Sequence, residues 1–339
     1  MIEASFGFLV LVIGVAVVFD FVNGFHDSAN AIATVVSTRV LSILTAVIMA
    51  GVLNFVGALS GTAVAKVVGA GIVAPDGITM TTVAAGLMAA IVWEILTYFL
   101  KLPVSASHSL IAGVAGAGVA TAGLGVLVLH GIQKTMLGVV FSPLIGFMIG
   151  YLVMLSLYWA LRRASQSFVN STFGRLQILS AAAMAFSHGS NDAQKTMGII
   201  TLALSVHYNW AARGIPFEVP FWVIFLSGTA IALGTYAGGY RMIKTLGIRI
   251  VHMQPINGFA AETAAAMVIE SASRLGFPLS TTHVISSTIM GQGATKRFSA
   301  VRWGVVKSIV LAWVITFPFC GLLGALLYVI LHYLVGLLS

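Results

Sequence analysis

Long apolar segments separated by short polar connections fill most of the chain. The runs Phe6–Val22 and Val310–Leu338 show no period-two alternation, which favours helices over the strands of a membrane barrel. At about 20 apolar residues per span, the pattern predicts helical segments in two groups of five. They cover residues 6–38, 41–65, 80–101, 104–122 and 135–161, and then residues 176–207, 219–240, 255–275, 279–294 and 303–338. We therefore expect an all-α polytopic membrane protein.

A polar stretch divides the two groups of segments. Residues 162–175 include Ser165, Gln166 and Asn170, and we interpret them as a cytoplasmic linker. The linker would join a first repeat over residues 1–161 to a second repeat over residues 176–339. Because each repeat has an odd number of segments, the second repeat should have inverted topology relative to the first, as in many secondary transporters.

Composition agrees with a membrane location. Only 8% of the 339 residues are charged, whereas a soluble domain carries roughly 25%. The net charge of +8 does not indicate nucleic-acid binding, because the basic residues form no dense patch. They fit a multi-pass protein of the cell membrane with both termini outside, since cytoplasmic loops are rich in Lys and Arg. In that orientation the inner loops contain Arg39, Arg162, Arg163, Arg175, Arg241, Lys244, Arg249, Lys296, Arg297 and Arg302, and the outer loops contain Lys66, Lys134 and Arg213.

Two polar clusters, residues 23–30 and 187–195, interrupt the first apolar segment of each repeat. An aspartate at the bilayer centre costs about 2.5–3.5 kcal/mol, and Asp27 and Asp192 occupy matching places. Gly24 and Gly189 would let each helix unwind, so the first helix of each repeat is expected to be broken there. Carboxylate, amide and hydroxyl oxygens suit Na⁺ or a proton, although each aspartate could instead only cap a half-helix. The predicted cation ligands are Asn23, Asp27, Asn30, Ser187, Asn191 and Asp192.

Two further motifs begin with Pro103 and Pro278, each followed by Ser or Thr residues and a histidine. Proline ends one helix and the hydroxyl residues cap the next, so each repeat is expected to contain a re-entrant helical hairpin. Helix N-termini present N–H donors and partial positive charge, which are the parts of an anion site. The two hairpins would enter from opposite sides, so that their tips could meet. The candidate anion ligands are Ser105, Ser107, Ser280, Thr281 and Thr282, with Gln194 from the second polar cluster.

Other polar residues in the apolar segments are weaker candidates. Four histidines flank the motifs and could bind zinc or copper, but no pair has local metal-ligand spacing and soft cysteine ligands are absent. We therefore predict no transition-metal site. Glu94, Glu262 and Glu270 are secondary candidates for a route by which cations reach the site. The chain has no nucleotide-binding motif and no well-placed catalytic cluster, so we expect neither an enzyme nor a resident cofactor.

At the four motifs the sequence resembles the inorganic phosphate transporter (PiT) family of cation-coupled phosphate permeases. The repeated aspartate segments and the Pro-x-Ser-x-Ser-His and Ser-Thr-Thr-His tips carry the resemblance, which spans nearly the whole chain. His26 stands where the family pattern often has Asn. The chain is similar to the compact prokaryotic members, because it lacks a long central hydrophilic domain. The resemblance implies phosphate as the substrate, whereas the residues alone imply a small oxyanion with a cation.

The expected function is secondary active symport of inorganic phosphate with Na⁺ across the membrane by alternating access. A cation beside Asp27 and Asp192 would remove their repulsion of the anion. Neutral oxygen ligands in the clusters favour Na⁺, but coupling to H⁺ remains an alternative. A sulfate or other oxyanion permease on the same scaffold, an ion channel, and an intramembrane enzyme acting on lipid phosphates are the rival interpretations. The sequence also leaves a homo-oligomer open.

Overall fold

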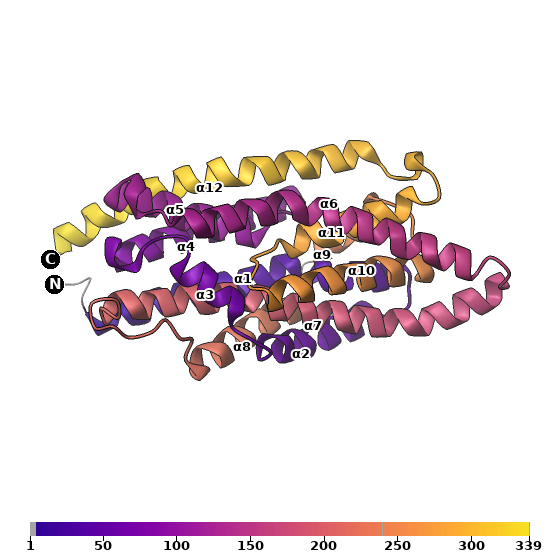
Figure 1. The fold of residues 1–339 in the computed structure, drawn as a ribbon, viewed down its shortest axis with the longest axis horizontal. Helices are drawn as coiled ribbons and strands as arrows, with labels where there is room; N and C mark the ends of the chain where they lie inside the picture. Colours follow the sequence, from indigo (N-terminus) through magenta and orange to yellow (C-terminus); the bar gives the residue numbers. More distant parts are fainter. Residues whose placement is uncertain (1–4, 239, 339) are drawn as a thin grey trace.

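The computed structural model describes residues 5–238 and 240–338 and is drawn in Figure 1. Within these residues the structure is helical, with no strand beyond an isolated β-bridge between Val73 and Leu127. The expected all-α class is confirmed. Serine hydroxyls accept backbone N–H groups at several helix starts, for example Ser42 from Thr45 at 3.2 Å and Ser165 from Phe168 at 3.3 Å.

The helices follow the predicted segments closely. The first half contains α1 (Phe6–Ser37), α2 (Ile43–Ala58), α3 (Ala63–Ala70), α4 (Met80–Leu100), α5 (Ala106–Ala122) and α6 (Leu129–Ala160). The second half contains α7 (Gln166–His207), α8 (Phe221–Ala237), α9 (Tyr240–Lys244), α10 (Pro255–Arg274), α11 (Thr281–Ala294) and α12 (Trp303–Leu338). A π-helical turn over Thr245–Arg249 continues α9, and short 3-10 turns lie in three connections.

The predicted breaks in the first helix of each repeat are wrong. Helix α1 continues through Asp27, and α7 continues through Asp192. The glycines serve close helix packing instead. A Cβ atom on Gly24 would collide with the backbone carbonyl of Ile231 in α8, and one on Gly189 would collide with that of Asn54 in α2. Each glycine therefore lets two helix backbones approach, without unwinding its own helix.

The connection between the two halves is shorter than the predicted linker. Helix α7 already begins at Gln166, so residues 166–175 are helical and the connection comprises residues 161–165. The packing partners in the two halves are reciprocal. Helix α1 packs on α8 as α7 packs on α2, and α5 packs on α12 as α11 packs on α6. This pattern supports the division into two repeats, whose inverted topology remains a prediction.

Several helices can cross a membrane. Among the described residues, α1, α4, α6 and α12 are each long and apolar enough to do so. Two bent pairs, α2 with α3 at 75° and α8 with Met242–Arg249 at 73°, would add one span each if each pair formed a single span. Large apolar side chains on the outer helices are exposed, such as Met148 at 60% and Leu322 at 74%. An integral membrane protein explains this surface.

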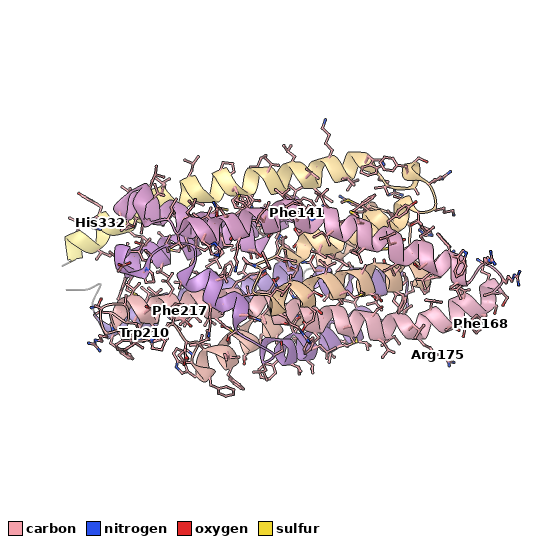
Figure 2. All side chains as sticks on the ribbon, in the orientation of Figure 1. Phe141, Phe168, Arg175, Trp210, Phe217 and His332 are labelled. Carbon is pink, nitrogen blue, oxygen red and sulfur yellow. The ribbon has the colours of Figure 1, made fainter. Side chains whose placement is uncertain are left out.

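The two ends of the molecule differ. Met1–Ala4 and Ser339 lie outside the described residues. The beginning of α1 and the end of α12 lie at the same end of the molecule in Figure 1. The connections α6–α7 and α11–α12 lie toward the opposite side. Figure 2 places Phe168 and Arg175 at that opposite end, whereas Trp210 and His332 lie toward the termini. The placement of both termini outside the cell remains a prediction.

Candidate functional site

The tips of the two hairpins, α4–α5 and α10–α11, meet. The Ser107 hydroxyl donates a hydrogen bond of 3.1 Å to the backbone carbonyl of Leu279. The rings of His108 and His283 lie edge to face, with centroids 4.6 Å apart. Residues about 172 positions apart in sequence therefore touch. The structure brings the two tips together as the sequence predicted.

Helix α12 holds both tips in place. The Trp313 indole N–H donates 3.0 Å to the backbone carbonyl of Pro103, and its ring stacks on His283 with centroids 3.7 Å apart. Ser105 and Ser280 are the N-caps of α5 and α11, because their hydroxyls accept the N–H groups of the histidines three residues later at 3.3 and 3.1 Å. Two helix N-termini therefore begin side by side in a buried region.

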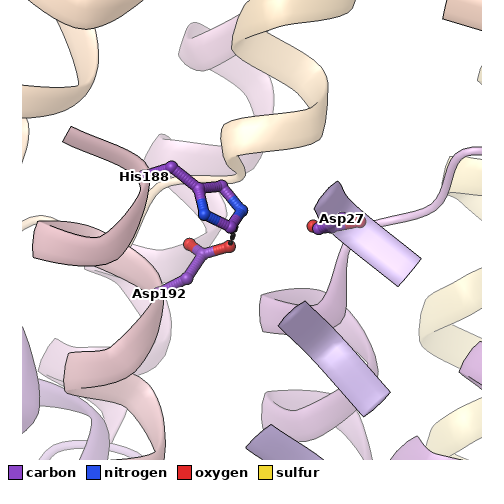
Figure 3. Close-up of side chains that lie close together, drawn as sticks. All are labelled: Asp27, His188 and Asp192. Atoms are coloured by element: carbon purple, nitrogen blue, oxygen red, sulfur yellow. Dashed lines mark ion pairs between the residues drawn. The ribbon is translucent and has the colours of Figure 1, made fainter. Parts of the chain in front are cut away.

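The two aspartates also converge, as Figure 3 shows. Asp27 of α1 faces Asp192 and His188 of α7, and one ligand atom from each of these three residues lies within 4.8 Å of the others. His188 Nε2 is 3.2 Å from Asp192 Oδ2. All three residues are at most 2% exposed. The structure therefore places the carboxylates of both polar clusters in a single site.

Hydroxyl groups of the second tip bind these carboxylates directly. Thr282 donates 3.0 Å to Asp27 Oδ2, and Thr281 donates 2.9 Å to Asp192 Oδ2. The Asn30 amide donates 2.9 Å to the Thr282 hydroxyl. Two of the predicted phosphate ligands therefore contact the two predicted cation ligands that carry charge. The hairpin tip and the carboxylates form one continuous polar site.

The other predicted cation ligands lie around this cluster. Asn191 donates 2.8 Å to Ser273, and Ser187 donates 3.4 Å to the backbone carbonyl of Ala266, so both residues contact α10. Asn23 is fully buried. Neither polar atom of Asn23, nor Asn191 Oδ1, has a hydrogen-bond partner among the described residues. Buried amide oxygens of this kind are free to coordinate a hard cation.

Gln194 has structural partners. Its Oε1 accepts the Val64 N–H at the start of α3 at 2.8 Å, and its Nε2 donates to the Ser190 carbonyl at 2.6 Å. Thr62, the N-cap residue of α3, makes no capping hydrogen bond with its side chain. The Gln194 side chain takes its place and satisfies an N–H group in the first turn of α3. Contact between Gln194 and phosphate remains a prediction.

Sequence reasoning did not place Lys195 or His26 among the ligands of the site. Lys195 Nζ forms an ion pair with Asp192 Oδ1, and its side chain is 1% exposed. His26 Nδ1 lies 2.8 Å from Asp27 Oδ1. Spacing could have revealed the first pair, because residues three apart on a helix are neighbours and a lysine in an apolar helix needs a partner. The second pair joins adjacent residues.

Three further acidic residues have different surroundings. Asp20 and Glu94 are fully buried and lie within electrostatic range of Asp192. Glu94 is thus near the site, as a secondary candidate should be, and Asp20 lies seven residues before Asp27 on the same helix. Glu270 is instead paired with the exposed side chain of Arg274 at 2.9 Å.

Glu262 forms a separate buried cluster that joins three helices. Its carboxylate accepts hydrogen bonds from Thr34 of α1 and from Ser180 and Gln177 of α7. Because this carboxylate is satisfied by neutral donors on two neighbouring helices, its arrangement resembles a structural junction between α1, α7 and α10.

The cluster has the ligand types of a cation site. Asp27 and Asp192 offer carboxylate oxygens, which suit a hard cation such as Na⁺. The unpaired amide oxygens of Asn23 and Asn191 lie on the same two helices, within four residues of these aspartates. The imidazole of His188 also lies in the cluster, and imidazole with carboxylate is a set that transition metals accept. The predicted absence of a transition-metal site therefore remains a prediction. The hairpin tips beside the cluster offer hydroxyl groups and the N-termini of α5 and α11, whose hydrogen-bond donors suit an anion.

Buried hairpin tips, two carboxylates and an apolar helical exterior define the class of the protein, a membrane transporter of small ions. The chain belongs to the phosphate transporter family, whose sequence profile matches residues 23–324. This is a family of transporters and not of enzymes.

Individual relatives cover almost the whole chain. A protein of Rhizobium meliloti (strain 1021), described as a probable low-affinity inorganic phosphate transporter, is 46% identical and covers 96% of each chain. A protein of Bacillus subtilis (strain 168) with the same description is 42% identical over 95% of this chain and 97% of its own. A solved structure described as the sodium-dependent phosphate transporter has the same fold, with a TM-score of 0.85 and 24% identity over 96% of this chain and 99% of its own.

Proposed function

We propose that this protein is a secondary active transporter that carries inorganic phosphate across the cell membrane together with Na⁺, by alternating access. The observation that carries the proposal is the contact between the second hairpin tip and the two carboxylates, through Thr281 and Thr282. Family membership supports phosphate as the substrate. The name of the structural neighbour supports Na⁺ as the coupling ion.

The hydroxyl groups of Thr281 and Thr282 explain how the cation and the anion would be coupled. In the structure both hydroxyls donate to Asp27 and Asp192, so the two carboxylates lie directly beside the hairpin tip where an anion would bind. A bound Na⁺ offsets the carboxylate charge and competes with the hydroxyls for the same oxygens. The hydroxyls are then free to donate to phosphate, so each ligand raises the affinity for the other.

Ser105, Ser107 and Ser280 complete the proposed phosphate site at the tips of the hairpins. Their side chains and the first N–H groups of α5 and α11 would surround the anion. Because the site lies where the hairpins meet, movement of one hairpin relative to α1 and α7 would open it to one side of the membrane at a time. The proposed inverted repeats give that movement two equivalent directions.

Uptake of radiolabelled phosphate into proteoliposomes tests this function, with the Na⁺ gradient and the pH gradient imposed separately. The proposal predicts accumulation driven by inward Na⁺, competition by unlabelled phosphate and little competition by sulfate. Accumulation driven only by the pH gradient would replace Na⁺ with H⁺ as the coupling ion. Strong competition by sulfate would identify a general oxyanion permease, and ion conduction without accumulation would identify a channel.

A further inference from the structure

The two aspartate motifs differ in charge at one equivalent position. Asn30 follows Asp27 by three residues, and Lys195 follows Asp192 by three residues. Both residues lie one helical turn beyond their aspartate, on the same face. The amide of Asn30 donates to Thr282, whereas the ammonium of Lys195 is paired with the aspartate itself. The second repeat therefore holds a fixed positive charge where the first repeat has a neutral group.

The ammonium of Lys195 lies where a cation bound to Asp192 would lie. It contacts Oδ1, while Thr281 and His188 contact or approach Oδ2. The side chain is 1% exposed, and a buried ammonium is tolerated only when it is paired.

Asp27 has no comparable lysine or arginine partner among the described ion pairs. Its carboxylate accepts a hydrogen bond from the Thr282 hydroxyl and lies 2.8 Å from His26 Nδ1. Asp27, Asp192 and Lys195 together hold two carboxylates and one ammonium, which leave one net negative charge. One monovalent cation is sufficient to neutralise it.

We propose that Lys195 is a built-in second cation, so that the transporter binds a single mobile coupling ion, at Asp27, for each phosphate. The inference rests on the proposed function and specifies its stoichiometry. Lys195 neutralises the carboxylate of Asp192 in every state of the transport cycle, whereas the mobile ion at Asp27 binds and leaves. Lys195 thereby determines how steeply transport depends on the cation.

The dependence of phosphate uptake on Na⁺ concentration in proteoliposomes tests the proposal. For the unmodified protein the curve should be hyperbolic, with a Hill coefficient of about 1. Lys195→Asn reproduces the chemistry of the first repeat and opens a second Na⁺ position, so its curve should become sigmoidal with a Hill coefficient that approaches about 2. Lys195→Arg keeps the charge and should keep the hyperbolic curve. Lys307→Asn removes an exposed positive charge on α12 and is the matched control.

Equilibrium binding of ²²Na⁺ and of radiolabelled phosphate to the purified unmodified protein decides the case in which Lys195→Asn does not fold. The proposal predicts one bound Na⁺ for each bound phosphate at saturation. Two bound Na⁺ for each phosphate would overturn the proposal, because Asp192 would then bind a mobile cation as well.

The result for the unmodified protein separates this inference from the proposed function. A sigmoidal curve that Lys195→Asn leaves unchanged would refute the role of Lys195 and leave Na⁺-coupled phosphate transport intact. An unmodified protein that takes up no phosphate under a cation gradient would refute the proposed function itself.

Discussion

Replacing Thr282 by Val tests whether the second hairpin tip is shared by cation and anion. Valine has nearly the same shape as threonine but cannot donate a hydrogen bond. The change removes the 3.0 Å bond to Asp27 and leaves the Asn30 amide without its acceptor at 2.9 Å. Thr282→Ser keeps the hydroxyl group and is the matched control.

The expected size of the effect follows from the hydrogen bond that phosphate would lose. A hydrogen bond to a charged group contributes about 1.5–3 kcal/mol, so the affinity for phosphate should fall about 10- to 150-fold. The affinity for Na⁺ in the absence of phosphate should not fall, because the substitution removes a hydroxyl that competes for the oxygens of Asp27. General damage to the fold would weaken both ligands together.

Equilibrium binding of radiolabelled phosphate and of ²²Na⁺ to the purified protein measures both affinities. Thr281→Val should behave in the same way, because Thr281 holds the corresponding bond of 2.9 Å to Asp192. If both valine variants bound phosphate with unchanged affinity, the second tip would not be the anion site. Loss of binding in Thr282→Ser would also refute the argument, because that variant retains the hydroxyl.

Three further predictions concern the helices that carry the carboxylates. Gly24→Ala should lower the free energy of unfolding by about 1–3 kcal/mol through overpacking. Gly14→Ala should not lower it, because the added Cβ meets nothing within 4 Å. Thermal unfolding in detergent compares the two variants. Asp192→Asn should destabilise the protein by about 3–5 kcal/mol, because Lys195 becomes a lone buried charge, and Lys195→Asn should restore the melting temperature. Asp27→Asn should abolish Na⁺-driven uptake while the protein remains folded, and wild-type uptake by this variant would make Asp27 a structural residue.

Much of the fold could be predicted because membrane helices are visible in the sequence as long apolar runs. The proline and hydroxyl motifs likewise located both hairpin turns. The continuity of α1 and α7 could not be predicted, because Gly24 permits either unwinding or a close helix contact. The packing of α8 against α1 decides between them, and that is a tertiary contact.

The membership of the site was predictable in part. Polar residues at membrane depth identified Asp27, Asp192 and the tip threonines. The convergence of these residues into one cluster depends on how the two halves pack, which no local pattern contains. Lys195 is different, because its spacing of three residues from Asp192 is visible in the sequence and could have revealed the ion pair.

Reciprocal binding of Na⁺ and phosphate to the purified protein tests the central claim most directly. Phosphate affinity is measured at a series of fixed Na⁺ concentrations, and Na⁺ affinity at a series of fixed phosphate concentrations. The account predicts that each ligand tightens the other by the same factor, about 5- to 150-fold, and that Asp27→Asn removes both effects. Phosphate binding that does not change with Na⁺ concentration would contradict the account.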